Sequence, residues 1–239
     1  VAHLSIIPMI MYGTWYHWLV AFFVYFITGC FGMTMTYHRL LSHASWKAPK
    51  WFHYFGTLAG TYGLTGSSIG WVAIHKEHHR HTDMEGDPHA PGVHGFIKVQ
   101  WLSMFYTPKP RYVIKLIRDS FHTFLHKYYF LIHLGIAVTW YAIDPMLGIF
   151  AFSFPAACVY FAAGAFGVIP HSKNFGYIVI TPRKDCTAVN SPLTSLISWG
   201  EGWHNYHHTI SKDYRHGHKR WEIDPPAWFI EKLFLISRG

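Results

Sequence analysis

The sequence predicts an all-α integral membrane protein with about four transmembrane helices, arranged as two hairpins with a helical cytoplasmic cap. Of its 239 residues, 51% are hydrophobic and only 13% are charged, which departs from the usage of soluble domains. Residues 1–37 contain no Asp, Glu, Lys or Arg, and residues 128–169 contain only Asp144. All 20 Lys and Arg residues fall within residues 39–127 and 173–238. Long charge-free segments therefore alternate with basic ones.

The first predicted hairpin covers residues 1–37. A helix needs about 20 apolar residues to cross the hydrocarbon core of a bilayer. Residues 15–37, "WYHWLVAFFVYFITGCFGMTMTY", meet this requirement. Residues 1–12, "VAHLSIIPMIMY", are too short to cross alone, and we expect them to be the remainder of a truncated first span.

The second predicted hairpin covers residues 128–169, with spans at 128–143 and 146–169 that turn at "IDP". Because Lys and Arg accumulate on the cytoplasmic side of short loops, residues 38–127 and 170–239 are both expected there. No repeat or long linker divides the chain, so residues 1–239 form one predicted domain. The net charge of +8 indicates contact with anionic headgroups or an acidic protein. No nucleic-acid recognition motif accompanies that charge, so no nucleic-acid partner is expected.

The pattern HxxHH occurs twice among the 20 histidines, although chance predicts roughly 0.14 occurrences. His75, His78 and His79 form one copy in "HKEHHRHTD", and the other copy lies in "EGWHNYHH". Positions i, i+3 and i+4 lie within a 100° arc of a helix, so three imidazoles share one face. His81 falls outside that arc and is expected to be a bystander. The second copy consists of His204, His207 and His208.

Two further elements are His38 and His43 in "HRLLSH", and His171 after Pro170. Five residues correspond to 140° of an α-helix, so His38 and His43 converge only if the helix ends or if they approach a metal from different sides. Eight histidines in three boxes exceed the four ligands of a tetrahedral zinc, which indicates two metals. Iron is the productive choice because zinc has no redox chemistry. A histidine-rich solvated surface, or a metal store or transporter, is the alternative.

The chain resembles the membrane-bound fatty acyl desaturases in nearly its whole length. The resemblance rests on "HRLLSH", on the HxxHHxxxDxxxDPH frame of "HKEHHRHTDMEGDPH", and on "GEGWHNYHH". The last motif is similar to the branch that introduces the first double bond into saturated chains. The resemblance implies a di-iron centre with nine ligands, which fall on His38, His43, His75, His78, His79, His171, His204, His207 and His208.

The activity that this resemblance implies is O₂-dependent insertion of a cis double bond, at the delta-9 position, into an acyl chain carried by CoA or a lipid. Two electrons would come from a separate cytochrome b5 or ferredoxin, because no haem-binding domain is visible in the sequence. The location implied is a bacterial inner membrane or the endoplasmic reticulum, with the histidine boxes on the cytoplasmic side. The alternative is another membrane di-iron oxygenase, such as a hydroxylase, epoxidase or ketolase.

Carboxylates near the boxes are expected to accept hydrogen bonds from the outer ring N–H groups of the ligands. Trp71 and Trp203 are expected to form walls of a narrow apolar acyl tunnel, with membrane-interface anchoring as the alternative. His216 and His218 are expected to make interface contacts, and His89 belongs either behind the ligands or in a loop. The carboxylate candidates are Asp83, Asp87, Glu201 and Asp185.

Two departures from the family pattern stand out. Family members usually carry Asn four residues before the histidine matched by His171, where it reaches a metal through water, and this chain has Gly167. Acyl-CoA members of animal type carry charged residues just ahead of the second box, where this chain has Ala73 and Ile74. The second departure favours an acyl-lipid or bacterial-type substrate.

Overall fold

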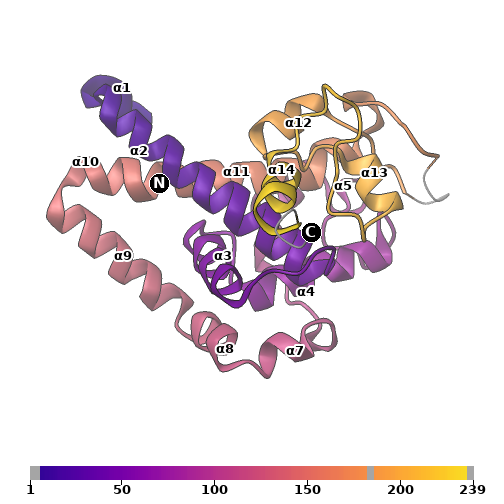
Figure 1. Cartoon of the computed structure of the whole chain (residues 1–239), viewed down its shortest axis with the longest axis horizontal. Helices are drawn as coiled ribbons and strands as arrows, with labels where there is room; N and C mark the ends of the chain where they lie inside the picture. The colour runs from indigo at the N-terminus through magenta and orange to yellow at the C-terminus, as the bar shows by residue number, and fades with distance from the viewer. Residues whose placement is uncertain (1–5, 182–185, 236–239) are drawn as a thin grey trace.

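The computed structural model describes residues 6–181 and 186–235, and every regular element of more than one residue in that part is a helix (Figure 1). This confirms the all-α prediction. Apart from short 3-10 turns, the helices of the first half are α1 (Ile6–Tyr12), α2 (Trp15–Phe26), the π-helical η2 (Ile27–Ser42), α3 (Lys50–Tyr62), α4 (Ser68–His81), α5 (Pro91–His94) and α6 (Phe96–Leu102). Those of the second half are α7 (Ile114–Ile117), α8 (Ser120–Lys127), α9 (Tyr129–Ile143), α10 (Pro145–Leu147), η5 (Gly148–Ser153), α11 (Phe154–Val168), α12 (Pro192–Ile197), α13 (His204–Thr209), α14 (Pro225–Ile230) and η8 (Glu231–Leu235).

The first long helix is continuous from Trp15 to Ser42, because α2 runs directly into η2. Its 28 residues exceed the number that a bilayer crossing requires. The sequence predicted a span at residues 15–37, and the helix extends five residues further. His38 therefore lies within the helix instead of following it.

The second long helix is continuous from Pro145 to His171. α9 precedes it, and Asp144 caps the new helix by accepting a hydrogen bond from the backbone N–H of Met146 at 2.6 Å. Proline at the first helical position supports the same start. The turn therefore lies at "IDP", where the sequence predicts it.

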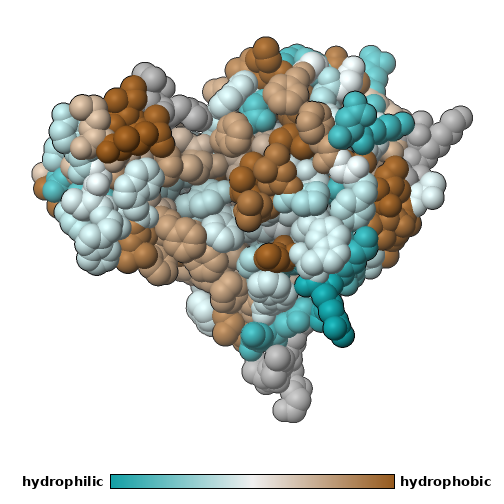
Figure 2. All heavy atoms as spheres, turned by 90° about the horizontal axis from the view of Figure 1, so that it is seen from above, coloured by the Kyte–Doolittle hydropathy of each residue, from teal (hydrophilic) through white to brown (hydrophobic). Residues whose placement is uncertain are grey.

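Two helices, Trp15–Ser42 and Pro145–His171, are long and apolar enough to cross a membrane, and Tyr129–Ile143 is apolar but shorter. α1 has seven residues, and residues 1–5 lie outside the described part. Large apolar side chains are exposed along α2 and α9, including Trp15 and Phe130 at 78% each. Strongly hydrophilic residues gather on the right of Figure 2, away from the end that holds α1 and α10.

Helix α3 lies unusually close to η2, and this contact positions the first histidine box. A Cβ atom on Gly32 would lie 2.3 Å from the backbone nitrogen of Gly60. Small residues permit such a close approach of two helices. The Tyr37 hydroxyl, one residue before His38, forms a 2.9 Å hydrogen bond with Thr61 on α3.

Candidate metal centre

The second histidine box lies on α4. Ser67 caps this helix by accepting a hydrogen bond from the Gly70 backbone N–H at 3.3 Å. His75, His78 and His79 share one face of the helix, as their spacing predicts. His81 belongs to neither of the histidine groups described below.

The first box converges through π-helical geometry. The backbone N–H of His43 donates to the carbonyl of His38 at 3.2 Å, which is an i→i+5 hydrogen bond. This arrangement brings the two rings within 4.9 Å, although they would diverge on an α-helix. The two histidines therefore lie together through a π-helical turn, which is neither of the two arrangements that the sequence suggested.

The third box lies on the six-residue helix α13, which the side chain of Asn205 anchors. Its Oδ1 accepts from the backbone N–H groups of Val179 and Ile180, both at 2.9 Å. Its Nδ2 donates to the carbonyls of Ile180 and Ala188 at 3.0 Å. A helix this short is not stable alone, so this buried amide accounts for its fixed position.

The nine histidines expected as ligands gather into two groups. In each group the chosen ring nitrogens all lie within 4.8 Å of one another. His78 and His79, which are adjacent in sequence, belong to different groups, and so do His207 and His208. The first group is His38, His43, His75, His79 and His207, and the second is His78, His171, His204 and His208.

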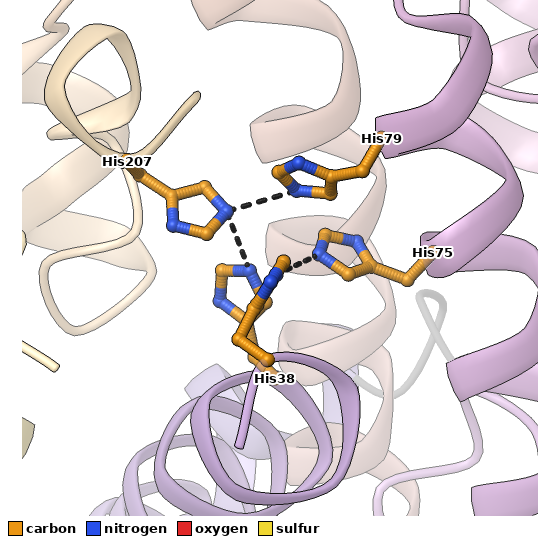
Figure 3. A group of neighbouring side chains, drawn as sticks. His38, His75, His79 and His207 are labelled. Atoms are coloured by element: carbon orange, nitrogen blue, oxygen red, sulfur yellow. Dashed lines mark hydrogen bonds between the residues drawn. The ribbon is translucent and has the colours of Figure 1, made fainter. Parts of the chain in front are cut away.

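Within each group, the ring nitrogens point toward a centre of that group. In the first group, His207 Nε2 lies 3.0 Å from His38 Nε2 and 2.9 Å from His79 Nε2, as the dashed lines in Figure 3 show. In the second group, His204 Nε2 lies 3.1 Å from His171 Nε2 and 2.9 Å from His208 Nε2. The rings come from helices that are far apart in the sequence.

The donor set fits a bound metal ion. A neutral imidazole has one N–H and one lone pair, so His207 Nε2 cannot satisfy two facing ring nitrogens by hydrogen bonding. Two nitrogens that bind one metal at about 2.1 Å lie about 3.0 Å apart at a right angle, close to the observed separations. Imidazole ligands suit iron, copper and zinc.

The electrostatic environment keeps these imidazoles in the form that binds metals. Burial, followed by the proximity of other histidines, lowers the pKa values of His75, His79 and His207 well below the ordinary value. The same causes act on His204 and His208. A neutral ring leaves a lone pair free for a cation.

Three carboxylates lie behind the histidines, on the side away from the centre. Asp87 accepts from His78 Nδ1 at 2.8 Å, and Asp83 pairs with His171 Nδ1 at 3.0 Å. Glu201 pairs with His38 Nδ1. Each contact places the proton on Nδ1 and leaves the Nε2 lone pair facing the group. Asp185, the fourth predicted carboxylate, lies outside the described residues.

Asp87 is the most completely enclosed of these carboxylates, with none of its side chain exposed. Burial by itself would raise its pKa, but the facing His78 ring and the backbone N–H of His89 outweigh burial and lower the pKa to about 2. Asp83 Oδ2 additionally accepts from the backbone N–H of Thr187 at 2.7 Å. Both carboxylates therefore carry negative charge near the second group.

Glu201 is also the centre of an ion-pair network that the sequence did not reveal. Its Oε1 lies 3.4 Å from Arg39, and its Oε2 lies 3.3 Å from His216 Nδ1. Arg39 in turn pairs with Asp224 at 2.9 Å. His216 is 1% exposed, so the expectation that it makes an interface contact was wrong. The basic run "RHGHKR" suggested exposure, but the ring of His216 packs 4.4 Å from that of His207.

A small apolar cavity of about 30 Å³ reaches the first group. His38, Glu201 and Trp71 line it together with residues of both long helices, including Met33 and Ala162. Trp71 also stacks on His75 with a ring separation of 4.9 Å.

Trp203 lies elsewhere. Its indole N–H donates to the carbonyl of Ile223 at 2.9 Å, and it lines a separate hollow with Trp221. The structure therefore places one of the two predicted tunnel tryptophans at the cavity beside the histidines.

Comparison with known proteins agrees with this geometry. The family model described as fatty acid desaturase matches residues 14–216. The chain is 33% identical to an sn-1 stearoyl-lipid 9-desaturase of Anabaena variabilis over 91% of this chain and 80% of that protein. It is 34% identical to an sn-2 palmitoyl-lipid 9-desaturase of Nostoc sp. over 90% and 77%, and 30% identical to an acyl-CoA 5-desaturase of Anemone leveillei over 92% and 69%. The chain is therefore an oxidoreductase that belongs to the fatty acid desaturase family.

Proposed function

We propose that this enzyme uses O₂ and two iron ions to insert a cis double bond at the delta-9 position of a saturated, lipid-bound acyl chain. The observation that carries the proposal is the gathering of nine histidine nitrogens into two groups beside an apolar cavity. The names of the most similar relatives support the delta-9 position and the lipid carrier. Multi-histidine sites also occur in proteins that only store metal, but metal storage does not require an apolar cavity beside the site.

Five histidines would hold one iron and four would hold the other. Bound iron would supply the O₂-dependent removal of hydrogen from unactivated methylenes, which no amino-acid side chain can accomplish. The residues of the chain prepare the site for that chemistry. Asp83, Asp87 and Glu201 hold the ring protons on Nδ1 and offset positive charge, since the imidazoles bring none of the negative charge that thiolate or carboxylate ligands would.

The acyl chain would enter between the two long helices. A second apolar hollow, on the outer surface, shares Tyr25, Ala162 and Trp199 with the cavity beside the histidines. Cys158 and Leu196 line its outer part. A methylene chain that followed both hollows would pass His38 and Glu201, and no lysine or arginine lines either hollow. This path supports an uncharged aliphatic substrate drawn from the membrane.

The membrane arrangement that we propose is multi-pass, with two hairpins in residues 1–37 and 128–169. The histidine-bearing segments 38–127 and 170–239 would then lie on the cytoplasmic face of one domain, in a bacterial inner membrane or the endoplasmic reticulum. The positions of all 20 Lys and Arg residues support this orientation. The exposed apolar side chains of α2 and α9 support their contact with lipid.

An external electron donor, cytochrome b5 or a ferredoxin, would dock on the basic segment 212–220, which follows α13 and carries His216. Arg215, Lys219 and Arg220 are exposed there. Exposed Lys212 donates from its ammonium group to the carbonyl of His43 at 2.8 Å, which links this segment to the site. Opposite charges on two partners accelerate and orient their encounter.

Expression in a host that lacks fatty acid desaturation tests the proposal, with a ferredoxin or cytochrome b5 system supplied. Gas chromatography with mass spectrometry of the lipids should show new cis-monounsaturated chains. His79→Ala should abolish them, and His81→Ala, which removes a histidine outside both groups, should retain them. A hydroxylated or epoxidised product in place of the alkene would instead support another membrane di-iron oxygenase.

A further inference from the structure

The two histidine groups are unequal. Within residues 6–181 and 186–235, five ring nitrogens converge in the first group and four in the second. His171 of the second group follows Gly167 by four residues, about one helical turn, and Gly167 contributes no side chain there. The second group is therefore short of one donor relative to the first.

The side chain of His89 lies where a side chain of Gly167 would begin. A Cβ atom on Gly167 would lie 3.2 Å from His89 Nδ1, closer than ordinary van der Waals contact. The absence of a side chain at residue 167 is thus what leaves room for the imidazole. The ring of His89 lies 5.5 Å from the ring of His78, which belongs to the second group.

His89 Nδ1 is enclosed, and no described residue forms a hydrogen bond with it. Buried polar groups in native structures almost always have a partner, so an isolated one indicates an unseen ion or water. The backbone of His89 is fixed, because its N–H donates to Asp87 Oδ1 at 2.8 Å. The same carboxylate holds His78, so His89 and a second-group ligand share one support.

We propose that His89 completes the second metal site by binding a water molecule that in turn binds the metal. This inference rests on the proposed function. A water link is required because His89 is not among the histidines whose nitrogens lie within 4.8 Å of one another. A cavity of about 40 Å³, which His89 lines together with the polar residues Gln100, Ser103 and Thr65, has room for such a water.

Chelator competition on the purified, metal-loaded protein tests this assignment, with total bound iron and zinc per chain as the readout. His89→Ala should reduce the binding affinity for one of the two metals 10- to 100-fold, the usual effect of losing an outer contact, and leave the affinity for the other metal unchanged. Gly167→Asn should restore the weaker metal in the His89→Ala background, since the amide would extend into the same space. His81→Ala, from the end of the same helix that carries His78, is the matched control and should retain both metals.

The proposal is overturned if His89→Ala retains both metals at wild-type affinity, if both weaken equally, if His81→Ala has the same effect, or if the double variant stays as weak as the single one. A wild-type chain that binds no metal would instead refute the proposed function, and this inference with it. Two tightly held metals that do not respond to His89→Ala would refute the inference alone.

Discussion

Replacing Asp87 with Asn should weaken the second metal site. Asp87 Oδ1 accepts from His78 Nδ1 and the His89 backbone N–H at 2.8 Å each. Oδ2 accepts from His78 Nδ1 at 2.9 Å and from the Asp83 backbone N–H at 2.7 Å. Asn keeps one oxygen, so its NH₂ group must face one of the two backbone donors.

Two contributions set the magnitude. The pKa of Asp87 falls from 3.8 to about 2, and this difference corresponds to about 2 kcal/mol of stability at neutral pH. Because the folded-state pKa is depressed, this stability is present above about pH 4 and is lost as the pH falls through about 2. A buried backbone N–H without an acceptor costs about 1–3 kcal/mol more. The total is about 3–5 kcal/mol, and we expect the second metal to bind 10- to 100-fold more weakly.

Thermal unfolding and chelator competition measure these two effects. Glu85→Gln is the matched control, because Glu85 lies in the same loop, is exposed, and loses the same charge. It should change neither quantity. An Asp87→Asn variant that melts and binds metal like the wild type would refute the assignment of Asp87 as the support of His78.

Three further changes have equally definite outcomes. Ala162→Phe, which fills the space shared by the two apolar hollows, should reduce desaturation of C18 chains at least 10-fold (about 1.4 kcal/mol). Leu193→Phe, at an exposed residue that lines neither hollow, should leave desaturation unchanged. Equal product yields from the two variants in gas chromatography would contradict the acyl path. Glu201→Gln leaves buried Arg39 paired with one carboxylate, Asp224, in place of two, and should cost about 3–5 kcal/mol in denaturant unfolding. Glu231→Gln, at the half-exposed pair with Arg215, should cost less than about 1 kcal/mol. Similar losses in the two variants would argue against the network. The melting temperature of the chelator-treated protein should fall as the pH drops below about 6.5. Imidazoles with lowered pKa values stay neutral in the folded protein but bind protons in the unfolded chain, so each lowers the free energy of unfolding by about 1.4 kcal/mol per pH unit. A melting temperature that does not change between pH 7.5 and 5.5 would contradict this.

Several features could be predicted from the sequence because they depend on local order. The lengths of the charge-free segments predicted the two long helices and the turn at Asp144. The spacing of His75, His78 and His79 predicted one shared helical face, and the acids near the boxes included three that contact histidines. Helical periodicity, and the helix length needed to cross a membrane, depend on residues within a few turns of one another. Both can therefore be recognised in a single sequence.

Other features depend on which helices meet, and no local pattern encodes that. The division of His78 and His79 between two groups follows from the approach of α13 and His171 to α4. Glu201 contacts His216 only because the chain beyond α13 folds back over the first group, which also buries a basic run that looked exposed.

The sequence by itself determined the helical class, the membrane-length segments and the nine histidines that gather into two groups. The tertiary structure alone decided how those residues are shared between two sites, which carboxylate supports which ring, and that His89 occupies the space left by Gly167. The reason is physical: a helix sets the directions of its own side chains, whereas the coordination of a metal depends on the relative positions of several helices.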